Sequence, residues 1–173
     1  MQLETKRLIL RQPRVSDAAA YTAIHNSHFV LRYNAMNPTT PERMEEVFQD
    51  PEYLENTVFL EEKETGELIG AIFLEEDSLR YGVASKGISY FLAENHSRKG
   101  YMKEAMEVVI AHLFVAEGLE CVSARAFTAN IASRALLKSL GFREDGIIPR
   151  CVKGYGGVIF DDAIHTLFHE DLE

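Results

Sequence analysis

Cysteine, tryptophan and long apolar runs are scarce or absent in this sequence, and each shortage excludes a class of protein. Two cysteines among 173 residues leave no disulfide framework of the kind that small exported domains use. No stretch reaches the roughly 20 consecutive apolar residues that span a bilayer. Residues 1–14 carry charges every few positions and lack the apolar core of a signal peptide. We therefore expect a cytoplasmic protein without a membrane partner.

Basic residues are also in short supply, with 18 Lys and Arg against 27 Asp and Glu and a net charge of −9. Because phosphate binding needs a basic footprint, this balance argues against a protein that coats nucleic acid. An acidic field instead raises the local concentration of cationic or amine substrates. The histidine pairs His25/His28 and His165/His169 have no cysteine pair beside them, so we expect structural or solvated histidines and no metal site.

The chain has enough apolar residues, 46%, for a substantial core. It shows no repeat, low-complexity tract or linker, so residues 1–173 are expected to form a single domain. Apolar periodicity and capping residues predict helices first, then an antiparallel meander, then alternating strands and helices, which is a mixed α/β (α+β) fold. The predicted helices cover 18–24, 40–48, 100–117 and 130–140, and their expected caps are Ser16-Asp17 for the first, Thr40 for the second and Asn130 for the last. Apolar residues recur in 100–117 at three- and four-residue spacing and predict one buried stripe: Met102, Ala105, Met106, Val109, Ile110, Leu113 and Phe114. Residues 64–67 predict a hairpin turn in which Gly66 supplies the positive φ. The predicted strands cover 8–11, 57–60, 68–74, 87–92, 121–127, 142–148 and 158–168.

The turn before the longest predicted helix carries the first candidate site. Its free backbone N–H groups and the positive end of the helix dipole favour an anion. Arg98, Lys99 and Lys103 add positive charge, and Gly100 lets a ligand approach the backbone closely. The pattern indicates an anion site, most simply for a diphosphate, although a solvated basic turn at a helix start has the same composition. It does not follow the GxxxxGK[ST] pattern of nucleotide triphosphatases.

Several segments resemble the GNAT superfamily of N-acetyltransferases. The segment from Ser97 to Ala105 resembles the acyl-CoA pyrophosphate loop, Q/R-x-x-G-x-G/A, of which Gly100 is kept and Met102 replaces a small residue. The segment 130–142 is similar to the signature N-x-x-S-x-x-x-L-x-x-x-G-F. Residues 4–11 and the Phe160-Asp161-Asp162 segment resemble the Rim-type branch, the ribosomal-protein N-acetyltransferases and their relatives.

The resemblance implies both a fold and a reaction. The fold is a mostly antiparallel, twisted sheet of about six to seven strands flanked by about four helices. The reaction is transfer of an acetyl group from acetyl-CoA to a primary amine, by direct attack and without a covalent enzyme intermediate. The amine belongs either to a protein N-terminus or to a small molecule, and the protein is expected to be a monomer or a homodimer.

The resemblance also assigns roles to residues. Backbone groups near Phe91 and Leu92 are expected to bond the pantetheine arm where their strand parts from its neighbour. The pyrophosphate would be held by the loop residues Arg98, Lys99, Gly100, Tyr101, Met102 and Lys103. Asn130 would contact the cofactor arm, and Ser133 is a possible acid at the departing sulfur. Both residues also suit the start of a helix, where an asparagine caps well. Met102 is tolerable if it points into the core.

The general base is left open by the sequence. The glutamate that the Rim-type branch places before the final loop falls at Arg150 or Cys151, so it is absent, and His165 replaces a common tyrosine. Glu94 is retained as a candidate base, and Glu75, Glu76 and Tyr101 are others; each also suits a solvated surface position. The missing glutamate and Met102 motivate an alternative, a non-catalytic acyl-CoA-binding regulatory module. A plain structural domain is a third possibility.

Overall fold

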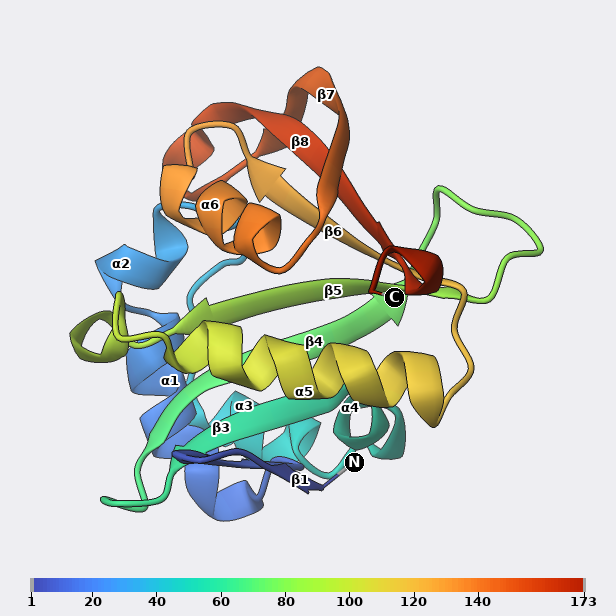
Figure 1. Ribbon diagram of the computed structural model, residues 1–173. Helices are drawn as coiled ribbons and strands as arrows, with labels where there is room; N and C mark the ends of the chain where they lie inside the picture. The colour runs from blue at the N-terminus through green and yellow to red at the C-terminus, as the bar shows by residue number, and fades with distance from the viewer. Residues whose placement is uncertain (1, 173) are drawn as a thin grey trace.

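An eight-stranded sheet organises the chain in the computed structural model, which describes residues 2–172 (Figure 1). Its strands run in the order β1-β2-β3-β4-β5-β6-β8-β7. All neighbours are antiparallel except β5 and β6, which are parallel. The strands are β1 (Leu3–Glu4), β2 (Leu8–Arg11), β3 (Thr57–Glu62), β4 (Leu68–Glu76), β5 (Ser85–Leu92), β6 (Cys121–Phe127), β7 (Arg143–Lys153) and β8 (Ile159–Phe168).

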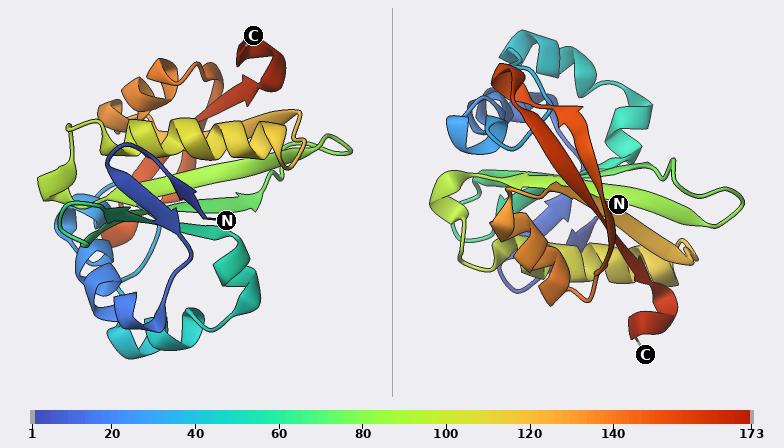
Figure 2. Two further views of the ribbon diagram at one scale, coloured as in Figure 1. Left: turned by 60° about the horizontal axis from the view of Figure 1, so that its bottom comes forward. Right: turned by 90° about the horizontal axis from the view of Figure 1, so that it is seen from above.

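Helices cover both faces of the sheet. One face carries α5 (Tyr101–Val115) and α6 (Ile131–Ser139). The opposite face carries α1 (Ala18–His25), α2 (His28–Leu31), α3 (Pro41–Val47) and α4 (Pro51–Glu55), as the two further views show (Figure 2). No helix among the described residues is both long enough and apolar enough to cross a membrane.

The longest helix, α5, follows from its apolar spacing. All seven residues of the predicted stripe are buried, and they pack against β2 to β6 in the larger of two core clusters. The stripe consists of Met102, Ala105, Met106, Val109, Ile110, Leu113 and Phe114. Met102 therefore points into the core, as its position in the helix predicts. A second, aromatic cluster lies under α1 and α3 and includes Tyr21, Phe48, Phe59 and Phe91.

Local turn and cap signals are confirmed at several positions. Thr40 caps α3 by accepting a hydrogen bond from the Arg43 N–H, and Asn130 caps α6 by accepting one from the Ser133 N–H. Gly66, with φ of 72°, forms the predicted hairpin turn between β3 and β4. These features depend on residues within a few positions of one another, which is why the sequence predicts them.

The sequence underestimates the number of elements. Eight strands and six α-helices are described, against about six to seven strands and about four helices expected. The missed elements are β1, α2 and α4, of two, four and five residues, which are too short to show a hydrophobic period. Strand β7 also runs past the predicted end at 148 to Lys153, with a register shift between Ile148 and Val152.

The predicted cap at Ser16-Asp17 is wrong. A 3₁₀ turn, Val15–Asp17, precedes α1, and neither of these side chains caps the helix. Instead, the Asp17 carboxylate accepts hydrogen bonds from the Arg14 N–H and from two nitrogens of Arg11, at 2.7, 2.8 and 2.9 Å. The ion pair with Arg11, six positions earlier on β2, has taken the carboxylate that would otherwise cap the helix.

Candidate active site

The two parallel strands part halfway along their length. Strand β5 pairs with β6 only from Ser85 to Ile88, opposite Cys121 to Ala124. Beyond Ile88 it pairs with β4 alone, down to Leu92 opposite Gly70. The edge of β5 that faces β6 therefore carries unpaired backbone groups from Ser89 to Leu92, which can accept an extended amide ligand as if it were another strand. The predicted parting of this strand is confirmed.

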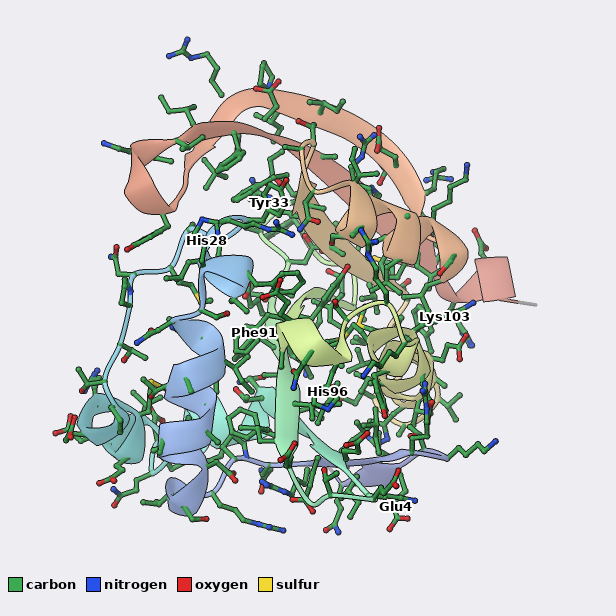
Figure 3. The ribbon with its side chains drawn as sticks, turned by 90° about the vertical axis from the view of Figure 1, so that its left-hand side faces the viewer. Glu4, His28, Tyr33, Phe91, His96 and Lys103 are labelled. Atoms are coloured by element: carbon green, nitrogen blue, oxygen red, sulfur yellow. The ribbon has the colours of Figure 1, made fainter. Side chains whose placement is uncertain are left out.

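A cleft of about 1120 Å³ opens where the strands part. Its walls come from the ends of β4, β5 and β6, the first turn of α6, and the segments around α1 to α4. Figure 3 looks at this side of the molecule, with Phe91 near the centre and Tyr33 above it. The volume slightly exceeds the roughly 300–1,000 Å³ typical of small-molecule sites, so it has room for the reacting ends of two substrates.

Two hydroxyl groups meet inside the cleft. The Tyr90 Oη lies 2.8 Å from the Ser133 Oγ, and both residues line the cleft. Ser133 is held in the first turn of α6 because its N–H donates to the Asn130 Oδ1 at 3.2 Å. Burial raises the pKa of Tyr90 to about 12, and the bond to Ser133 lowers it only in part. The phenol thus keeps its proton throughout the neutral range and can donate a hydrogen bond.

Tyr90 was not predicted from the sequence, although a signal for it exists. Residues alternate along a strand, so Tyr90 shares a face of β5 with Ile88 and Leu92. That face packs against α5, as the membership of the larger core cluster shows. Phe91 lies on the other face, in the aromatic cluster under α1. Recognising which face meets α6 requires the tertiary structure.

The face of the cleft that carries Phe91 is acidic. The Ser89 hydroxyl donates to Glu75 Oε1 at 2.8 Å, and both side chains line the cleft. Four further carboxylates line the cleft, Asp50, Glu52, Glu76 and Asp162, of which Glu76 lies on the opposite face of β4 from Glu75. Two cations are present, and both are paired, since Lys86 bonds Glu117 at 2.8 Å and Arg125 bonds Asp162 at 2.6 Å. In the described part of the chain, no ion pair neutralises the other four carboxylates of the cleft.

The loop before α5 has the geometry of an anion site. Arg98 and Gly100 both adopt positive φ, 59° and 81°, on either side of Lys99. The first helical bond runs from the Glu104 N–H to the Gly100 carbonyl at 3.0 Å, so the N–H groups of the three preceding residues have no helical acceptor. The side chains of Arg98, Lys99 and Lys103 are exposed, and Figure 3 shows Lys103 directed outward from the start of α5.

The remaining predicted residues fall in different places. Three of them, Phe91, Asn130 and Ser133, line the cleft. Glu94 is exposed on the 3₁₀ turn Glu94–His96 and does not line the cleft. The Tyr101 side chain turns toward the β3–β4 hairpin, where its hydroxyl donates to Glu62.

The residues that depart from the Rim-type pattern, His165, Arg150 and Cys151, make contacts with other parts of the chain. His165 is 2% exposed, with Nε2 3.4 Å from Glu144, and it does not line the cleft. The Arg150 N–H donates to Asp161 at 2.7 Å. Cys151 accepts from Arg125 at 3.1 Å, so its thiol lies beside a guanidinium and not beside a histidine base.

Parted parallel strands next to a helix N-terminus with free amides suit a ligand that has an extended amide arm and an anionic end. A family model described as "Acetyltransferase (GNAT) domain" matches residues 7–143. The chain is 31% identical over 176 residues to the "uncharacterized N-acetyltransferase YoaA" of Bacillus subtilis (strain 168), with 95% of each chain covered. The protein therefore belongs to the GNAT family and is an acetyl-CoA-dependent N-acetyltransferase.

Two solved structures illustrate the likeness of the fold. The ribosomal-protein-S5-alanine acetyltransferase from Vibrio fischeri superimposes with a TM-score of 0.87 at 20% identity, covering 100% of this chain and 99% of that one. A spermidine N-acetyltransferase from Vibrio cholerae, in complex with CoA and spermine, gives 0.83 at 19% identity, covering 96% of this chain and 99% of that one. The predicted resemblance to the family is confirmed, and the neighbours include Rim-type enzymes.

Proposed function

We propose that this protein transfers the acetyl group of acetyl-CoA to the primary amine of a small cationic molecule, by direct attack within the cleft. The observation that carries the proposal is the parting of β5 from β6 into a cleft whose other wall is acidic. The free strand edge suits an acyl-pantetheine arm, and the unneutralised carboxylates suit an ammonium group.

The residues present fit acetyl-CoA. The unpaired backbone of β5 near Phe91 and Leu92 matches an extended arm that contains amides. The loop at Arg98, Lys99 and Gly100, with Tyr101, Met102 and Lys103 in the first turn of α5, matches a diphosphate. Asn130 lines the cleft, and its proposed role is to contact the arm. When bound, acetyl-CoA supplies the thioester carbonyl that the amine attacks.

The amine must lose a proton before it can attack, because an alkyl ammonium has a pKa of about 10.4. Glu75 is the proposed proton acceptor. It lines the acidic wall, and the Ser89 hydroxyl at 2.8 Å orients its carboxylate. Acceptance directly or through one water is consistent with the reach of a general base. Glu94 lies outside the cleft, so we assign this role to Glu75.

The departing sulfur needs hydrogen bonds when the C–S bond breaks. The Tyr90–Ser133 pair is the proposed source, with one hydroxyl donating to the sulfur and the other supporting it at 2.8 Å. Because a raised pKa keeps the Tyr90 phenol neutral, the pair always has a proton to donate. These hydrogen bonds stabilise the negative charge on the sulfur as it leaves, and the thiolate then takes its proton from solvent.

A small polycation is the proposed acceptor class. At least four carboxylates of the cleft carry no salt bridge within the described chain, which leaves sites for a second ammonium away from the reacting one. The spermidine N-acetyltransferase of Vibrio cholerae shares the fold. The other acceptor that the sequence leaves open is a protein N-terminus. It carries one α-amine on a bulky chain, and the acidic wall does not specifically favour such a group.

Turnover with a panel of amines tests this proposal. Purified protein is mixed with acetyl-CoA and with spermidine, a monoamine, or a peptide that has a free N-terminus, and release of free thiol is followed. We expect the highest kcat/KM with spermidine and a loss of that preference in Glu75→Gln. Equal rates with all amines would contradict the acceptor class. Binding of CoA without turnover on any amine would instead support a non-catalytic module.

A further inference from the structure

Arg7 connects the start of the chain to the loop that precedes α5. It lies in the turn between β1 and β2, and it is distant in sequence from every predicted site residue. Its backbone N–H and its Nε donate to the two oxygens of Glu104 at 2.8 and 2.7 Å. Its Nη1 donates to the Lys99 carbonyl at 2.9 Å. One side chain therefore holds both the first turn of α5 and the loop before it.

Contacts with Glu104, Lys99 and Tyr101 hold the guanidinium, although the Arg7 side chain is 36% exposed. It lies over the Tyr101 ring, 4.1 Å from the ring centre. Glu104, its carboxylate partner, also accepts from the Thr5 hydroxyl at 2.5 Å. Burial alone would raise the pKa of Glu104, but the hydrogen bonds from Thr5 and Arg7 outweigh it and lower the pKa. Glu104 thus stays ionised at neutral pH and keeps Arg7 in place.

The bond to Lys99 sets the direction of one peptide plane. In a trans peptide the C=O and the N–H point in opposite directions. Because the Lys99 carbonyl points at Arg7, the Gly100 N–H must point away from it. A flipped peptide would present a carbonyl oxygen in place of that N–H and would repel an anion. With positive φ at Arg98 and Gly100, the loop adopts an uncommon backbone conformation that an external bond can stabilise.

We infer that Arg7 is a positioning residue for the diphosphate of the acyl donor. It holds the Lys99–Gly100 peptide so that the amides of Gly100 and of the start of α5 can converge on one anion. This inference rests on the proposed function. A lysine cannot replace Arg7, because a single ammonium lacks the planar fork that bonds Glu104 and Lys99 while stacking on Tyr101.

Two acyl donors, one with a diphosphate and one without, distinguish this role from a purely structural one. Acetyl-CoA contains the diphosphate, whereas S-acetyl-pantetheine presents the same thioester without it. In Arg7→Gln we expect kcat/KM for acetyl-CoA to fall about 10-fold or more, mainly through KM. The value for S-acetyl-pantetheine should stay within about twofold of the unmutated protein. Arg7→Lys should show the same donor-dependent loss. The control is Arg14→Gln. The Arg14 side chain is 63% exposed and lies 3.6 Å from Glu61, so its replacement should leave kcat/KM unchanged with both acyl donors.

Three outcomes would overturn the inference. An equal loss with both donors would assign Arg7 to general stability of the fold, and no loss would remove it from the donor site. Full recovery in Arg7→Lys would show that charge alone matters.

If Arg7→Gln does not fold, the comparison rests on Arg7→Lys. If the unmutated protein turns over neither donor, the proposed function fails, and calorimetry of CoA against pantetheine with the same variants still tests Arg7.

Discussion

At the scale of single residues, one pairing in the cleft joins positions that neither local pattern nor charge connects. Tyr90 belongs to a strand and Ser133 to a helix, 43 positions apart, and their hydroxyls lie 2.8 Å from each other. Ser133 is predicted as a possible acid by resemblance, and the structure adds the phenol behind it. Because a phenol with a pKa of about 12 does not ionise near neutrality, its hydroxyl keeps a proton that it can donate in a hydrogen bond there.

Replacement of Tyr90 by phenylalanine removes that donor and keeps the ring. We expect kcat to fall about 10²-fold, because removal of one positioned hydrogen-bond donor to a developing negative charge typically costs 10²–10³-fold. The KM for the amine should change little, since the hydroxyl does not face the acidic wall. Steady-state kinetics check both values. Tyr33→Phe is the control, because Tyr33 also lines the cleft and should leave kcat unchanged. An unaltered kcat in Tyr90→Phe would exclude the pair from the chemistry.

At the scale of elements, a buried ion pair joins β2 to the turn that starts α1. Arg11 is 6% exposed and Asp17 is 9% exposed, and the Arg11 Nε also bonds Glu61 on β3 at 2.6 Å. The α1 to α4 face forms the outer wall of the cleft, so this ion pair orients the wall relative to the sheet.

Loss of one partner of this ion pair should destabilise the fold strongly. In Asp17→Ala we expect the free energy of unfolding to drop by about 3–5 kcal/mol, because a buried guanidinium loses its main counterion. Glu46→Ala removes the partner of Arg43 in an exposed pair, 65% and 70% accessible, and should cost at most about 1 kcal/mol. Urea denaturation measures both. Similar losses in the two variants would show that the Arg11 pair carries no special weight.

Prediction at the element scale succeeds or fails with the length of the pattern. The stripe of α5 repeats over four turns, so its period is visible in the sequence. Strand β1 and helices α2 and α4 contain too few residues for any period. Ser27 caps α2 and Asp50 caps α4, and these capping residues were the signals in the sequence that could have predicted the two helices. The strand after α6 was found, but not its extension past a register shift at Ile148.

At the scale of the whole molecule, charge is distributed unevenly. The net charge is −9, and the carboxylates of the cleft contribute to it, whereas Arg98, Lys99 and Lys103 gather at the start of α5. Two substrates of opposite charge are therefore attracted to different places. An acidic field speeds the arrival of a cation, and salt screens that field over a Debye length of about 10 Å at 0.1 M.

Ionic strength should consequently affect kcat/KM for a polycationic acceptor more than kcat/KM for a monoamine. With acetyl-CoA saturating, we expect kcat/KM for spermidine to fall as salt rises from about 0.02 M to about 0.3 M. An acceptor with only its reacting amine should show a weaker dependence, because it carries less charge. Thiol release at each salt concentration gives both slopes. Parallel slopes would indicate that the acidic wall does not attract the acceptor.

Helices α1, α3, α5 and α6, the amides before α5 and the 130–142 signature were readable from the chain, because each depends on residues close in sequence. The parting of β5 from β6 after Ile88 was expected only from the family resemblance. Two long-range contacts were not predicted: Tyr90 meets Ser133 across 43 positions, and Arg7 meets Glu104 across 97. Each of these contacts depends on how distant segments pack, and no local period or cap carries that information.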